Sequence, residues 1–249
     1  MTLYHIPAAA LAELNALATN GVVDITSTAV MNSAFYRAIQ SETELEVSGN
    51  YNLLRPNTLL LIARIVASSP TIHTIYIDHN GLRVHAPAVA AALAASHTIH
   101  SIYMSHNHLY AHGPATAIAL AASHTLHTVD MSNNDLGEYG PATATALAAS
   151  RTIHKVNISE NHLGAHGPAT ASALVLLPTI HSVNMRWNYL REYGPATAAV
   201  LADHNQNVAD LIELTHLICI EGHSMCDELV DLICSYLNVP IYFNPINLE

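Results

Sequence analysis

The sequence predicts an α/β fold: a right-handed solenoid shaped as an arc, with a parallel inner sheet of about seven strands, short outer helices and helical caps. Three observations support it. A 27-residue block recurs, each block has two halves of different hydrophobic period, and Gly-Pro opens the second half in four copies. A period of this size indicates a solenoid, because each unit can bury its apolar face only against its neighbours. The blocks begin at Thr71, Thr98, Thr125, Thr152 and Thr179.

The first half of each block predicts a short strand. In the second block, apolar and polar residues alternate from Ile102 to Ser105, which is typical of a strand with one buried face. Ile99, Asn107 and Leu109 complete the pattern L-x-x-L-x-L-x-x-N-x-L.

The second half of each block predicts a helix. It opens with Gly113-Pro114 in the second block, and proline suits the first helical position because that N–H has no helical partner. An alanine-rich run with helical spacing follows. We expect Thr143 and Thr170, in the third and fourth helices of this kind, on the exposed outer side.

The chain divides into three parts. Residues 1–43 are expected to form an N-terminal helical cap with a degenerate first repeat, residues 44–205 the repeats, and residues 206–249 an acidic C-terminal cap. Solenoids need atypical ends because an uncovered apolar face would bind other molecules.

Within the N-terminal part, the pattern predicts a helix over 7–19, an edge strand over 22–25 and a second helix over 29–40. Near the C-terminus, a last strand is expected at 208–211 and a helix at 223–237.

The repeat resembles the leucine-rich repeat family, in its helix-bearing, ribonuclease-inhibitor-like class, because five consecutive units match the pattern without gaps. The resemblance implies a non-enzymatic scaffold that binds a protein partner on its concave sheet face. The near-identical helices, the histidine-rich composition and the absence of a signal peptide also resemble leucine-rich-repeat effectors of Legionella-type bacteria. That resemblance implies a secreted bacterial effector acting on a host protein.

A second function comes from the same repeat class, which the Ran GTPase activators share. The alternative is therefore a GTPase-activating protein, with Arg83 or Arg191 in the loop after the strand as the group that stabilises phosphoryl transfer. Neither arginine stands in a matching motif.

The composition of the chain argues against some classes of partner and location. The formal net charge is −11, and the eight basic residues are scattered, which argues against nucleic acid. No apolar run is long enough for a membrane span, and no lysine or arginine precedes Arg37, which argues against a Sec signal peptide. We expect a monomer in the cytoplasm or injected into a host cytosol. From Asp203 onward, eight acidic residues and no basic ones form either a solvated cap or a surface that attracts a basic partner.

Two columns of equivalent residues are distinctive. The asparagine column (Asn80, Asn107, Asn134, Asn161 and Asn188) is predicted to satisfy backbone groups at the bend after each strand. The histidine column has three interpretations: duplicated rings that stack along the sheet edge, a metal site, or a pH sensor. Its members are His73, His100, His127, His154 and His181.

The candidate binding residues lie in columns that vary between copies and are predicted to project from the concave sheet face. Aromatic residues and arginine carry most interface energy, so they are the strongest candidates. Trp187 has a second interpretation, packing under the C-terminal cap. The candidates are Tyr76, Asp78, Tyr103, Asp130, Lys155, Asn157, Glu160, Asn184, Arg186 and Trp187.

Catalytic, metal and cofactor sites are not expected. The sequence has no G-x-S-x-G elbow, no phosphate-binding glycine loop and no H-E-x-x-H. Cys219, His223 and Cys226 have helical spacing, which could bring zinc ligands or a thiol–imidazole pair together, but Gly222 interrupts that helix and core packing is the simpler explanation.

Overall fold

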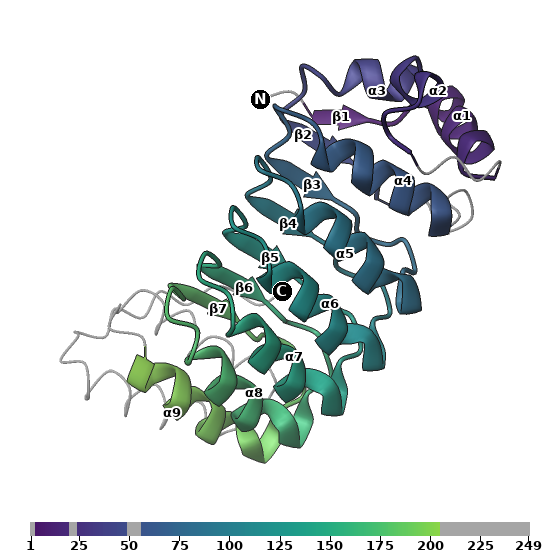
Figure 1. Cartoon of the computed structure of the whole chain (residues 1–249). Helices are drawn as coiled ribbons and strands as arrows, with labels where there is room; N and C mark the ends of the chain where they lie inside the picture. Colours follow the sequence, from purple (N-terminus) through teal and green to yellow (C-terminus); the bar gives the residue numbers. More distant parts are fainter. Residues whose placement is uncertain (1–2, 20–23, 49–55, 205–249) are drawn as a thin grey trace, which may run out of the picture.

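The computed structural model describes residues 3–19, 24–48 and 56–204, which form an arc-shaped α/β solenoid (Figure 1). Seven parallel strands pair in chain order in one sheet, which confirms the predicted fold class. The strands are β1 (Leu3–His5), β2 (Glu44–Glu46), β3 (Thr74–Tyr76), β4 (Ser101–Tyr103), β5 (Thr128–Asp130), β6 (Lys155–Asn157) and β7 (Ser182–Asn184).

The helices form a second layer along one side of the sheet (Figure 1). From α4 onward, each helix packs against the next, and α1 packs against α4. The α-helices are α1 (Ala8–Thr19), α2 (Thr28–Met31), α3 (Ala34–Ala38), α4 (Pro56–Ala67), α5 (Ala86–Ala94), α6 (Gly113–Ala121), α7 (Gly140–Leu147), α8 (Gly167–Leu174) and α9 (Gly194–His204). One 3₁₀ turn precedes each of the last five: η1 (Arg83–His85), η2 (Tyr110–His112), η3 (Gly137–Tyr139), η4 (Gly164–His166) and η5 (Arg191–Tyr193).

The strand register sets the two faces of the sheet. Ile75 of β3 pairs with Ile102 of β4, which pairs with Val129 of β5, and all three side chains are buried. In each of these strands the two flanking residues are only half-buried. The centre of each strand therefore faces the helices, and its flanking residues form columns on the open face.

The asparagine column performs the structural role predicted for it. The amide of buried Asn107 donates to the carbonyls of Met104 in its own repeat and of Ile77 in the preceding repeat, each at 3.0 Å. Its Oδ1 accepts the backbone N–H of Asn80 at 3.0 Å. The same bonds recur along the arc, so each asparagine joins two repeats at a bend where backbone groups would otherwise be buried unpaired.

The helix starts also join neighbouring repeats. A Cβ on Gly113 would overlap Leu136 and lie 2.7 Å from Thr143 Oγ1 in the next repeat, so the small residue permits close packing. The prediction that Thr143 and Thr170 are exposed is wrong, since both are buried. Their hydroxyls lie against the glycine of the preceding repeat and donate to the carbonyl four residues earlier.

The N-terminal part differs from its prediction in two places. The edge strand is β1, not residues 22–25: Asp24 and Ile25 are not in a strand, and Val22 and Val23 lie outside the described residues. The Asp24 carboxylate instead accepts the N–H and hydroxyl of Thr26, which fixes a turn. The helix predicted over 29–40 is divided into α2 and α3 because Ser33 caps the second helix, with its hydroxyl accepting the Tyr36 N–H.

The elements predicted at 208–211 and 223–237, and the C-terminal cap, lie outside the described residues. None of the described helices is long and apolar enough to cross a membrane.

Candidate functional site

The open face of the sheet carries eight of the ten candidate binding residues in three columns, formed by the two flanking residues of each strand and by the residue two positions after it. Glu160 and Trp187 lie in a fourth column, in the bend that follows. Because the strands are parallel and in register, equivalent side chains lie beside one another on adjacent strands. Each candidate on a strand is thus adjacent to its equivalents in the repeats before and after it.

Tyr76 and Tyr103 form one half of the site. Their rings stack with centroids 4.7 Å apart and planes within 13° of parallel. Both side chains are half-buried, so each ring retains exposed surface. Burial and nearby carboxylates raise the pKa of both tyrosines; for Tyr76 the carboxylate with the largest effect is Glu44, and for Tyr103 it is Asp130.

The carboxylates of Asp78 and Asp130, which lie near this tyrosine pair, are held in position by backbone N–H donors. Asp78 Oδ1 accepts the Ser105 N–H of the next repeat at 2.6 Å. Asp130 Oδ1 accepts the Ser132 N–H at 2.9 Å, and its Oδ2 accepts the Asn157 amide at 2.7 Å. These carboxylates therefore have defined positions on the face before any ligand arrives.

The other half of the site lies on β6 and β7. Lys155 is exposed, and Asn184 accepts the backbone N–H of Arg186 at 3.1 Å. Trp187 follows in the bend and is 45% exposed. Its alternative interpretation, packing under the C-terminal cap, involves residues outside those described.

The column that ends at Trp187 lies in the bend after each strand, where the backbone has positive φ. Its members are His79, His106, Asn133, Glu160 and Trp187. His79 and His106 stack there with centroids 4.0 Å apart, and the Asn133 amide donates to Glu160 Oε2 at 3.0 Å. Burial and the neighbouring His79 lower the pKa of His106, against the opposing effect of nearby carboxylates.

Side-chain contacts also link a neighbouring column, formed by His108, Asp135, His162 and Tyr189, which was not among the columns predicted to bind a partner. Asp135 lies between two histidines, with its oxygens 3.2 Å from His108 Nδ1 and 3.0 Å from His162 Nδ1. The His162 ring in turn stacks on Tyr189. The same 27-residue spacing that revealed the other columns would have revealed this one.

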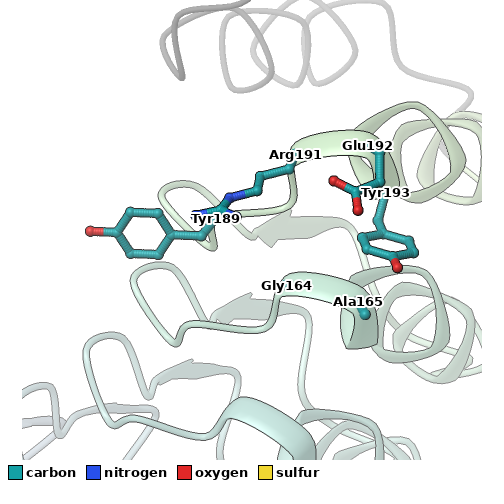
Figure 2. A pocket seen from close by; sticks show the side chains of 6 residues that line it. All are labelled: Gly164, Ala165, Tyr189, Arg191, Glu192 and Tyr193. Atoms are coloured by element: carbon teal, nitrogen blue, oxygen red, sulfur yellow. The ribbon is translucent and has the colours of Figure 1, made fainter.

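Two shallow hollows flank Tyr189 at the C-terminal end of the described repeats. One, of about 310 Å³, is lined by Asn133, Glu160, His162, Trp187 and Tyr189. Figure 2 shows the other, of about 280 Å³, with Tyr189 and Arg191 on one side and Glu192 and Tyr193 on the other, beside Gly164 and Ala165. Glu160 and Trp187 therefore line a common hollow, whereas Tyr76 and Tyr103 lie on strands earlier in the array.

In the histidine column, two neighbouring ring pairs are stacked and two are tilted: His73–His100 and His127–His154 are within 12° of parallel, whereas His100–His127 and His154–His181 are inclined by 45° and 52°. Successive ring centroids from His73 to His181 are 5.4, 5.1, 5.1 and 5.0 Å apart. Burial and the adjacent His100 and His154 lower the pKa of His127, since a second positive charge nearby is unfavourable. Within the described ranges, no group of three or more His, Cys, Asp or Glu side chains could hold a metal ion.

The two arginines considered for phosphoryl transfer are far apart. Arg83 begins η1 and Arg191 begins η5, so four repeats separate them, or roughly 19 Å at ordinary strand spacing. They cannot act together on one phosphate. Cys219, His223 and Cys226 lie outside the described residues.

The geometry identifies the repeat. Three-residue parallel strands, a buried asparagine ladder and a returning helix recur with a 27-residue period. The chain has a leucine-rich-repeat fold. No protein-family model and no curated protein sequence matches it.

Among solved structures, this leucine-rich-repeat chain is similar to the crystal structure of the leucine-rich repeat-containing protein LegL7 from Legionella pneumophila, with 20% sequence identity and a TM-score of 0.49. The match covers 72% of this chain and 58% of the LegL7 chain, so less than two thirds of LegL7 is spanned. At this identity the similarity concerns the fold alone.

Proposed function

We propose that this protein is an interaction scaffold that binds a protein partner with the concave, open face of its sheet. The observation that carries the proposal is a contrast between columns. The asparagines that are constant across the repeats, such as Asn107 and Asn134, are buried at the bends that the fold requires. The columns on the open face change between repeats, as from Tyr103 to Asp130 to Asn157, where folding does not dictate identity.

The chemistry of the open face supports the same proposal. Tyrosine, tryptophan and arginine bury large areas at little cost in side-chain entropy, and they dominate the energetics of protein interfaces. On the helix side, the strongly exposed apolar residues Ile118 and Leu176 lie in different repeats, one on α6 and the other in the turn after α8. Single exposed residues of this kind are ordinary on a protein surface.

The test is partner capture by the full-length chain, followed by binding measurements on variants. Arg186→Ser combined with Trp187→Asn reproduces the sequence of the third repeat, Ser132-Asn133, so the backbone of the bend should be preserved. We expect it to weaken partner binding by about thirtyfold, equivalent to about 2 kcal/mol, with little change in melting temperature.

The matched control lies on the helix side. Thr145→Ala combined with Ser172→Ala changes two exposed residues, and it should leave binding within about twofold. If the control weakened binding and the Arg186–Trp187 double variant did not, the convex face would be the working surface and the proposal would fail.

We further propose, from the sequence resemblance alone, that the protein is a secreted bacterial effector acting on a host protein. A translocation reporter fused to the chain should give a signal inside host cells only from a secretion-competent strain. Equal signals from competent and secretion-deficient strains would refute this part of the proposal and leave the scaffold proposal intact.

A further inference from the structure

Charge is divided along the open face. The three columns carry four carboxylates and no lysine or arginine from β2 to β5, whereas they carry Lys155 and Arg186 and no carboxylate on β6 and β7. The candidate carboxylate Glu160 lies outside these columns, in the bend after β6. We name the first part the acidic tyrosine face. It comprises Glu44, Glu46, Tyr76, Asp78, Tyr103 and Asp130.

The tyrosine pair occupies the middle of this face. Tyr76 stacks on Tyr103, and Glu46 pairs with Tyr76 in the strand register. The π-face of a tyrosine ring attracts a cation, and carboxylates beside the ring add a second attraction of the same sign. The face therefore combines the two groups that bind a guanidinium or an ammonium best.

Part of the face is already ordered. Ser105 N–H holds Asp78, and Ser132 N–H holds Asp130, so these carboxylates lose little freedom when a cation binds. All six side chains are half-buried and retain exposed surface, although Glu46 Oε2 already lies 2.9 Å from His5 Nδ1.

We propose that the acidic tyrosine face binds an arginine or lysine side chain from a basic segment of the protein partner. The inference rests on the proposed function and adds the chemistry and the position of the contact. Lys155 and Arg186 repel the same segment, which confines it to the half of the arc formed by β2 to β5.

Charge complementarity excludes two other occupants. A second copy of this chain has eight scattered basic residues and a net charge of −11, so it offers no basic segment. The stretch of this chain from Asp203 onward has eight acidic residues and no basic ones, so it would be repelled.

The experiment measures fluorescence anisotropy of a labelled nonapeptide of alternating glycine and arginine, added to the full-length protein. We expect saturable binding that weakens as salt is added, and no binding of a matched glycine–glutamate peptide. Glu44→Gln combined with Glu46→Gln should weaken binding of the arginine peptide about tenfold, since two carboxylates next to the cation are lost.

The control variant removes the same charge elsewhere. Glu138→Gln combined with Glu192→Gln alters two exposed carboxylates of η3 and η5, and it should change the affinity by less than about twofold. Equal losses from both double variants would mean that the peptide responds only to net charge, and the proposal would be overturned.

A second pair of variants tests the aromatic contribution. Replacing Tyr76 and Tyr103 with phenylalanine keeps the π-faces and should preserve the affinity within about twofold, whereas replacing both with leucine should weaken it about fivefold. Equal affinities of the two variants would overturn the tyrosine contact. The two proposals can fail separately. If a captured partner requires Arg186 and Trp187 but the arginine peptide does not bind, the scaffold proposal is supported and only this inference is refuted.

Discussion

Asn134→Ala tests the structural role of the asparagine ladder directly. Asn134 Oδ1 accepts the buried N–H of Asn107 at 2.8 Å. The Asn134 amide donates to the carbonyls of Met104, Met131 and Ser132, each at 3.0 Å. Alanine removes all of these bonds and supplies no replacement.

The expected loss follows from the groups left behind. Asn107 is fully buried, so its N–H has no water to replace the lost acceptor. The Met104 and Met131 carbonyls each lose one of two amide donors and keep that of Asn107 or Asn161. An orphaned buried group costs about 1–3 kcal/mol, and we expect about 3 kcal/mol in total. For a chain of this size that corresponds to a melting temperature lower by about 6–12 °C.

The assay is thermal and urea unfolding of the full-length chain, with Thr128→Ala as the control. Thr128 is half-buried on the open face of β5, so its loss should cost less than about 0.5 kcal/mol. Equal destabilisation by the two variants would refute the assignment of Asn134 to the buried bend and of Thr128 to the open face.

Two further predictions follow from the packing and the histidine column. Gly140→Ala should destabilise the chain by about 1–2 kcal/mol, because the added Cβ overlaps Leu163. Alanine favours a helix over glycine by up to about 1 kcal/mol, so the two effects oppose each other. A higher melting temperature for the variant would show that helix propensity outweighs the overlap. Burial and the neighbouring His100 and His154 lower the pKa of His127, so the unfolded chain takes up a proton more readily and stability should fall as the pH drops below about 6.5. His127→Gln should reduce this slope in melting temperatures measured between about pH 7.5 and about pH 5, and an unchanged slope would assign the effect to other groups.

The sequence was most informative where one residue type has one physical role. Asn107 and its equivalents were expected to be buried because an amide carries two N–H donors and a carbonyl acceptor, which match the backbone groups at the bend. Likewise Tyr76 and Tyr103 could be placed side by side, because the repeat period fixes the strand register.

Features decided by neighbours were harder to predict. β1 has no repeat pattern, and it is a strand because the edge of β2 is available for pairing. Thr143 was misplaced because threonine is common on helix surfaces, whereas here its position is set by a glycine in the preceding repeat. The division of charge along the open face likewise becomes visible only when the columns are viewed together on one sheet.

The uniform spacing of the asparagine ladder also bears on how such a gene changes length. The bonds from Asn80 to Asn107, from Asn107 to Asn134 and from Asn134 to Asn161 each span 27 residues. In-frame loss of one block by unequal recombination would therefore bring Asn107 next to Asn161 with the same contacts as before. The number of repeats can thus change between lineages without new contacts between repeats having to evolve. Each gain or loss would lengthen or shorten the open face of the sheet by one strand.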